Sequence, residues 1–164
     1  MSHLIITTAT IDDIPAIQRI AYKTWPVAYG SILSKEQIEY MLDEMYDKVS
    51  LTQQLNSSHQ FFIAHKGGEA IGFASVSKED GFFKLNKLYV LPAMQNTGAG
   101  KKLLHAVIEY VQKHGGIKLL LQVNRNNPAV SFYNKMGFVI LYEFNFDIGN
   151  DYFMNDYMME KIIG

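Results

Sequence analysis

The chain contains no cysteine, which excludes disulfide bonds, a catalytic thiolate and a cysteine-ligated zinc site. Its acidic and basic residues nearly balance, and the net charge of −1 gives no general attraction to nucleic acid or to an anionic membrane. No apolar run approaches the roughly 18 residues of a membrane-spanning helix, and the first residues lack the basic start and apolar core of a signal peptide. We therefore expect a soluble, cytoplasmic protein without a nucleic-acid partner, a membrane partner or a metal site.

The composition that remains is that of an ordinary globular chain. The 164 residues are 48% hydrophobic, which is enough for one sizeable core. No internal repeat, linker or low-complexity segment divides the sequence. We expect a single domain over residues 1–164.

Residues 85–104 are the most informative stretch of the chain. Aromatic and aliphatic side chains over residues 82–90 predict a strand, and Pro92 should end it because proline cannot donate to a β-ladder. Apolar residues then recur at helical spacing over residues 103–111. Gly98 and Gly100 therefore fall where this helix begins.

Glycine is unfavourable at the start of this helix, because each one costs roughly 1 kcal/mol relative to alanine in a helix interior. The same turn carries Lys101 and Lys102 and no carboxylate, although a helix N-terminus favours acidic residues. Bare backbone, free N–H groups and positive charge are what an incoming anion requires. We interpret the turn as a pyrophosphate-binding site.

Two motifs carry a resemblance to a known family. The segment Gln95-Asn96-Thr97-Gly98-Ala99-Gly100 resembles the Gln/Arg-x-x-Gly-x-Gly/Ala signature of the GCN5-related N-acetyltransferase (GNAT) superfamily. Residues 126–138, which read NNPAVSFYNKMGF, resemble that family's Asn-x-x-Ala-x-x-Phe-Tyr-x-x-x-Gly-Phe block. The resemblance covers essentially the whole chain. It implies a sheet that splays open beside the strand before the glycines, where the pantetheine arm of the cofactor lies.

The other predicted elements fit this fold. Periodicity, turn residues and helix caps predict strands at 4–8, 60–65, 70–76, 117–123, 138–146 and 152–163 and helices starting near 10, 34, 49 and 127. We expect the first helix to be broken at Trp25-Pro26 and residues 27–33 to be a connection. The order predicts a single-domain α/β fold with a mixed, mostly antiparallel sheet flanked by helices.

The resemblance implies acetyl-CoA as the cofactor and assigns its contacts. Leu88, Tyr89 and Val90 would bind the pantetheine through main-chain groups, and Asn126 would meet the same arm. The pyrophosphate would lie on the glycine turn, whose residues are Gln95, Asn96, Thr97, Gly98, Ala99, Gly100 and Lys101.

Direct transfer of an acetyl group to an amine needs a base for the amine and a proton for the departing thiolate. The resemblance places Tyr133 near the sulfur of the cofactor, as both a cofactor contact and the proton donor. Many family members carry a glutamate on the strand that corresponds to residues 82–90, but no carboxylate stands there. The general base is therefore unassigned, and a water relay or an acid from another loop would have to serve.

Two loops should border the acceptor side of the cleft, residues 25–33 and 147–155. The first loosely resembles polyamine-acetylating members through Trp25 and Tyr29. The second is acidic and aromatic, and Asp151 is its candidate ligand for a cationic amine. The same acids could equally be solubilising turn residues. We expect acetyl transfer to a primary amine, either of a small molecule, with polyamine-like compounds among the candidates, or of a protein.

The glycine turn lacks residues that two other phosphate-binding motifs require. A dinucleotide-binding oxidoreductase is disfavoured, because Leu103 replaces the third glycine and no acidic residue ends the next strand. A kinase-type phosphate loop is disfavoured, because Lys101 is followed by Lys102 and not by Ser or Thr. The missing strand carboxylate leaves open a non-catalytic module that binds an acyl-CoA and acts through a partner protein. A homodimer through the apolar residues 152–163 also stays open.

Overall fold

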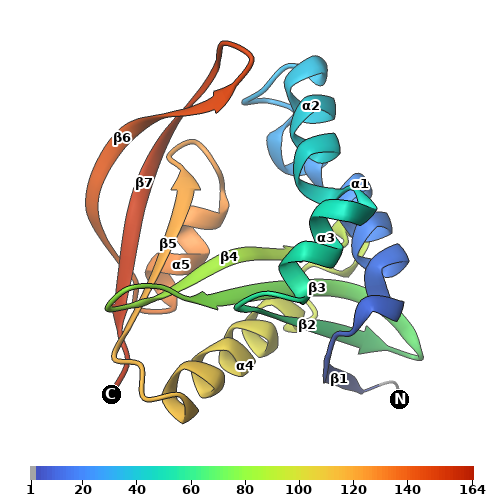
Figure 1. Cartoon of the computed structure of the whole chain (residues 1–164), viewed down its shortest axis with the longest axis vertical. Helices are drawn as coiled ribbons and strands as arrows, with labels where there is room; N and C mark the ends of the chain where they lie inside the picture. The colour runs from blue at the N-terminus through green and yellow to red at the C-terminus, as the bar shows by residue number, and fades with distance from the viewer. Residues whose placement is uncertain (1–2) are drawn as a thin grey trace.

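Seven strands form one sheet in the computed structural model, which describes residues 3–164 without the side chains of Phe146, Ile148, Tyr152 and Met154. The strands are β1 (Leu4–Thr8), β2 (His59–Lys66), β3 (Glu69–Lys78), β4 (Phe83–Val90), β5 (Lys118–Asn124), β6 (Val139–Gly149) and β7 (Tyr152–Ile162). Their order is β1-β2-β3-β4-β5-β7-β6 (Figure 1). Neighbouring strands are antiparallel except β4 and β5, which are parallel.

Helices cover both faces of the β1–β4 half of this sheet. They are α1 (Ile14–Tyr29), α2 (Lys35–Tyr46), α3 (Lys48–Leu55), α4 (Ala99–Lys113) and α5 (Ala129–Lys135), with short 3-10 helices η1 (Ile11–Asp13) and η2 (Pro92–Met94). α1, α2 and α3 lie on one side of the sheet and α4 lies on the other (Figure 1). The predicted mixed, mostly antiparallel α/β fold is confirmed. Within residues 3–164, no helix has the length and apolar character needed to cross a membrane.

The start of α2 shows how local sequence positions an element. The N–H of Gln37 donates to the Ser34 hydroxyl at 3.1 Å, and the N–H of Ser34 donates to the Gln37 side-chain oxygen at 2.8 Å. This reciprocal pair is the predicted capping box, and it satisfies two of the N–H groups that a helix start leaves without partners. It fixes where α2 begins after the turn that follows α1.

The predicted break at Pro26 is wrong, because α1 continues through this residue to Tyr29. Pro26 has no N–H to donate to the carbonyl of Tyr22, and a proline inside a helix costs about 3 kcal/mol. Trp25 and Tyr29 are only 2% and 8% exposed, and their ring centroids lie 4.6 Å apart. Burying a large apolar side chain contributes roughly 1.5–3 kcal/mol, so the two rings together offset the cost of the proline.

The sheet opens between β4 and β5. The two strands pair only at Phe83 with Leu119, Lys84 with Leu120 and Leu85 with Leu121. Beyond these three pairs β4 continues to Val90 and β5 to Asn124, but no further pairing joins them. The sheet is therefore splayed as predicted, and the edge of β4 that faces β5 has backbone groups available to a ligand.

Candidate active site

The glycine turn, residues 95–101, joins the splayed end of β4 to α4. The Thr97 hydroxyl donates to the carbonyl of Met94 at 2.6 Å, and the Gln95 side chain lies 3.5 Å from the carbonyl of Val90. Asn96 and Gly98 have positive φ angles of 71° and 88°. These left-handed residues turn the chain so that Gly98 becomes the N-cap of α4.

The N-terminus of α4 has the features of an anion site. Its first turn contains no acidic residue, and Lys101 and Lys102 are exposed beside it. The N–H of Lys102 donates to the carbonyl of Gly98, so the N–H groups of the preceding helix residues have no partner within the helix. A Cβ added at Gly98 would meet no non-neighbouring atom within 4 Å, which leaves space above the backbone. A pyrophosphate group therefore fits the residues present.

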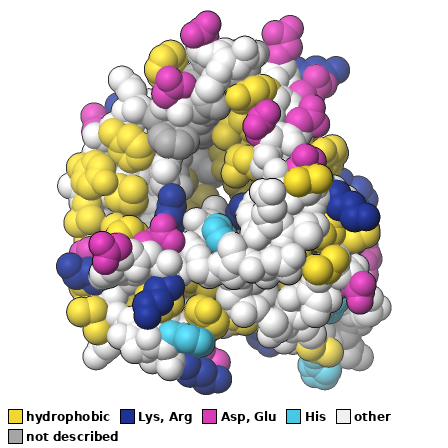
Figure 2. Space-filling model, in the orientation of Figure 1, with side chains coloured by type: hydrophobic (Ala, Val, Ile, Leu, Met, Phe, Trp, Pro, Cys, Tyr) yellow, Lys and Arg dark blue, Asp and Glu magenta, His cyan; other side chains and the backbone are white. Residues whose placement is uncertain are grey.

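The open edge of β4 runs from this turn toward the centre of the molecule. Leu88 is paired with Ala74 and Val90 with Gly72 on the β3 side, whereas neither has a partner on the β5 side. Figure 2 shows a hollow on this face of the molecule, between the helices and the β6–β7 hairpin. An extended ligand with amide groups could hydrogen-bond along this edge as an added strand does.

Three tyrosines meet beside the opening. The hydroxyl oxygens of Tyr29 from α1 and Tyr89 from β4 are 2.9 Å apart. Tyr133 of α5 is buried, and both its burial and the neighbouring Tyr29 oppose ionisation of its hydroxyl group. Burial is the largest cause that raises the pKa of all three phenols. Each hydroxyl therefore stays protonated well above neutral pH.

Asp156 on β7 is a carboxylate whose charge acts on Tyr29. It is 2% exposed, and its Oδ2 accepts a 2.7 Å hydrogen bond from the Gln122 side chain. Its Oδ1 is buried and has no hydrogen-bond partner among the described residues. Burial raises the pKa of Asp156, whereas hydrogen bonds from Gln122 and Asn124 lower it, and the charge of Asp156 contributes to the raised pKa of Tyr29.

The pattern around Asp156 offered one signal in the sequence. Aspartate is depleted in strands, and this one follows Asn155 within a predicted strand that is otherwise rich in apolar residues. Its neighbours Asn124 on β5 and Phe144 on β6 come from pairings that no local pattern specifies. The unusual residue type could therefore be recognised from the sequence, but its electrostatic effect on Tyr29 could not.

The remaining predicted residues lie at different depths. Trp25 is in the core, 5.8 Å from the ring of Tyr89 between centroids, and supports the tyrosines from behind. Asn126 is exposed in the β5–α5 loop, where its N–H donates to the Asn124 side chain at 2.9 Å. Asp151 is exposed at the tip of the β6–β7 hairpin. Asp156 lies five residue steps further along the chain, which corresponds to about 16 Å of strand.

Comparison with known proteins agrees with this geometry. The model of the acetyltransferase (GNAT) domain matches residues 31–146. A spermidine N(1)-acetyltransferase of Thermoplasma acidophilum is 28% identical over 162 residues, which cover 95% of each chain. An uncharacterised N-acetyltransferase of Mycobacterium bovis is 29% identical over 152 residues, which cover 91% of this chain and 97% of the relative. The crystal structure of the PaiA N-acetyltransferase of T. acidophilum in complex with coenzyme A has a TM-score of 0.86 at 28% identity and covers 98% of this chain and 99% of that chain. The chain belongs to the GNAT family of acetyltransferases.

Proposed function

We propose that the protein transfers the acetyl group of acetyl-CoA to a primary amine of a small cationic molecule, with polyamines as the first candidates. The observation that carries the proposal is the buried Asp156 Oδ1, which accepts no hydrogen bond among the described residues and whose carboxylate acts electrostatically on Tyr29. An unpaired buried acceptor is costly, and a donor such as an ammonium group would satisfy it. The similarity to a spermidine acetyltransferase supports a polyamine.

The cofactor would occupy the splayed side of β4. Acetyl-CoA supplies an acetyl thioester, which an amine can attack directly. The free N–H groups at the start of α4 and the backbone from Gln95 to Lys101 would bind its pyrophosphate. Main-chain groups of Leu88, Tyr89 and Val90 would hold the pantetheine, with Asn126 on the opposite side of the opening.

Asp156 would hold the acceptor amine and remove its proton. A carboxylate whose pKa is raised is a stronger base than an ordinary aspartate, and a base works best when its pKa approaches the working pH. Gln122 keeps one oxygen of Asp156 fixed, so the other is oriented for the amine. Tyr29 and Tyr89, linked through their hydroxyl groups, would line the approach, and Trp25 would position them.

Tyr133 would donate a proton to the departing sulfur. Its raised pKa keeps the hydroxyl protonated at neutral pH, so a proton is always available there. At the outer rim Asp151 would attract the further ammonium groups that a polyamine carries beyond the reacting one. Tyr133 would thus act on the reacting atoms, whereas Asp151 would contact the substrate away from them.

The test compares Asp156→Asn with Asp151→Asn on spermidine and on a monoamine of similar chain length. We expect Asp156→Asn to lower kcat/KM for both amines by about 10² or more, as loss of a general base does. Asp151→Asn should raise KM for spermidine alone and leave the monoamine unaffected. Wild-type turnover in Asp156→Asn would refute the role of Asp156. Tight acetyl-CoA binding without transfer to any amine of a broad panel would instead favour the non-catalytic acyl-CoA-binding module.

A further inference from the structure

Lys87 of β4 is a buried cation that the proposed reaction does not use. A register shift lets Ser75 pair with Lys87 while Val76 pairs with Leu85, so Asn86 is an extra residue in β4. This bulge turns Lys87 toward the helices, where its ammonium lies 5.5 Å from the ring centroid of Tyr46. The residue is only 6% exposed.

The ammonium of Lys87 has an orienting partner but no counter-charge. Its Nζ donates to Gln54 Oε1 at 2.8 Å, and Gln54 Nε2 donates to the carbonyl of Met45 at 3.2 Å. The Gln54 amide is thereby fixed between β4 and α2. Among residues 3–164 the ion pairs are Arg19 with Glu69 and Arg125 with Glu143, so none involves Lys87.

The charged surroundings of Lys87 are mainly basic. Burial and the charge of Lys84 lower the pKa of Lys87 to about 8. Burial and the charges of Lys87 and Lys84 lower the pKa of His59 on β2, and Glu79 at the end of β3 opposes this effect. Glu44 is the carboxylate of α2 that borders the same space. A negative charge that entered beside Lys87 would relieve the repulsion among these cations.

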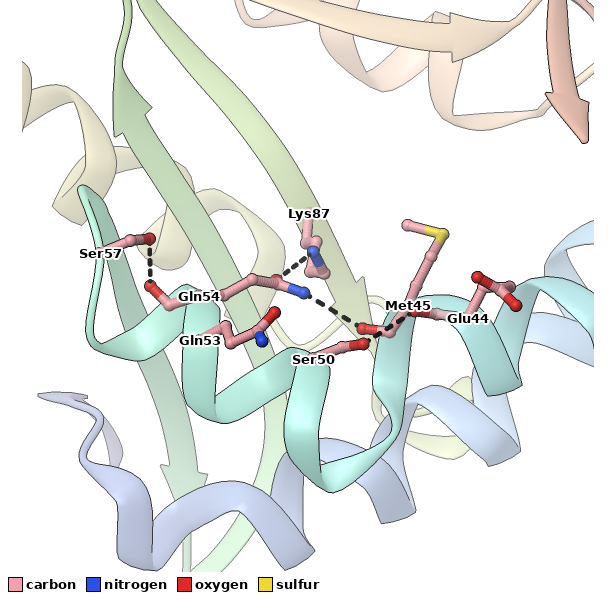
Figure 3. A pocket seen from close by; sticks show the side chains of 7 residues that line it. All are labelled: Glu44, Met45, Ser50, Gln53, Gln54, Ser57 and Lys87. Atoms are coloured by element: carbon pink, nitrogen blue, oxygen red, sulfur yellow. Dashed lines mark hydrogen bonds between the residues drawn. The ribbon is translucent and has the colours of Figure 1, made fainter.

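A pocket leads to this ammonium. It has a volume of about 380 Å³ and lies between α2, α3 and β4 (Figure 3). Its lining is polar apart from Met45, and Lys87 points into it beside Gln54 (Figure 3). A space of this size takes a small organic molecule. The lining residues are Glu44, Met45, Ser50, Gln53, Gln54, Ser57 and Lys87.

We propose that this pocket binds a small monocarboxylate, whose carboxylate pairs with the ammonium of Lys87. The single buried cation matches one negative charge, and Glu44 at the border of the pocket disfavours a dianion such as phosphate. The site lies on the face of β4 that α1, α2 and α3 cover, whereas the glycine turn leads into α4 on the other face (Figure 1). The proposal does not depend on the acceptor of the acetyl group.

The test is calorimetric titration of the full chain with acetate and with benzoate at constant ionic strength, and with inorganic phosphate as a separate arm. The variants are Lys87→Met, which keeps the length of the side chain without its charge, and Gln54→Glu, which places a carboxylate against Lys87. Lys84→Met is the matched control, because it removes a nearby charge that does not line the pocket. Titration of each variant with acetyl-CoA reports whether the fold and the cofactor site are intact.

We expect saturable binding of at least one carboxylate that weakens tenfold or more in Lys87→Met and Gln54→Glu and less than threefold in Lys84→Met. Wild-type affinity should fall about tenfold between pH 7 and pH 9 as Lys87 loses its proton. The proposal is overturned by three results: no saturable carboxylate binding, binding of phosphate alone, or equal affinity in wild type and Gln54→Glu. If Lys87→Met fails to fold, carboxylate binding by Gln54→Glu tests the proposal alone. A protein that binds carboxylates but transfers no acetyl group would count only against the proposed function.

Discussion

The conformation of Gly98 makes the glycine turn open to a quantitative test. Its φ of 88° is left-handed, which costs a residue with a side chain about 1–2 kcal/mol. A Cβ there would meet no non-neighbouring atom within 4 Å, so the cost of Gly98→Ala is conformational and not steric. In a domain of this size about 1 kcal/mol corresponds to roughly 2–4 °C, so we expect Gly98→Ala to melt about 2–8 °C below wild type.

Two further variants separate strain from bulk. Asn tolerates left-handed backbone, so Gly98→Asn should melt closer to wild type than Gly98→Ala while its side chain fills the space above the turn. Gly100→Ala is the matched control, because its Cβ would make only ordinary contacts, 3.8 Å from Phe132 and 3.9 Å from Val90. Alanine also favours the helix there, so this variant should melt at or above the wild-type temperature.

The assay pairs thermal unfolding with calorimetric titration of acetyl-CoA. We expect acetyl-CoA affinity to fall at least tenfold in both Gly98 variants and to change less than threefold in Gly100→Ala. Wild-type affinity in Gly98→Asn would refute the assignment of the space above Gly98 to the phosphates. Equal loss in Gly100→Ala would show that the whole turn, and not the left-handed residue, sets the affinity.

Three other outcomes are expected. Tyr133→Phe should lower kcat about 10²-fold with little change in KM for either substrate, in steady-state assays where the chemical step limits the rate; a change in KM alone would contradict a proton-donor role. Burial raises the pKa of Asp156, so the free energy of unfolding of wild type falls as the pH rises from 3.8 through the pKa of the native state. Asparagine does not titrate, so urea unfolding should show Asp156→Asn to be more stable relative to wild type at pH 7 than at pH 4. The pKa of Lys87 is about 8 in the native state against 10.5 in the unfolded state. The free energy of unfolding of wild type should therefore rise by up to about 3 kcal/mol relative to that of Lys87→Met between pH 8 and 10.5. Parallel dependence of the two free energies on pH would contradict this.

Features that depend on neighbouring residues were predictable from the sequence. The Ser34–Gln37 capping box, the glycine turn before α4 and the succession of helices and strands along the chain all follow from spacing and turn chemistry. The motif resemblance added the splay between β4 and β5, which hydrophobic patterning cannot show because both strands look like ordinary strands up to their ends.

Features that depend on distant contacts were not predictable. Pro26 stays inside α1 because Trp25 and Tyr29 pack against the sheet, and the energy of that packing outweighs the local preference to break. Lys87 is polar by sequence yet buried, because a bulge in β4 turns it under α3. Asp156 reaches the cleft only through the pairing of β7 with β5, a choice of partner that alternation within one strand does not encode.

The short β4–β5 ladder also has a mechanical meaning. Its three residue pairs are the only strand pairing, within residues 3–164, between the β1–β4 half of the sheet and the β5–β7 half. Few backbone hydrogen bonds therefore join the two halves of the sheet. A cofactor lying in the splay would contact both halves, so its binding would stabilise their association and supply part of the pairing that the sheet lacks there.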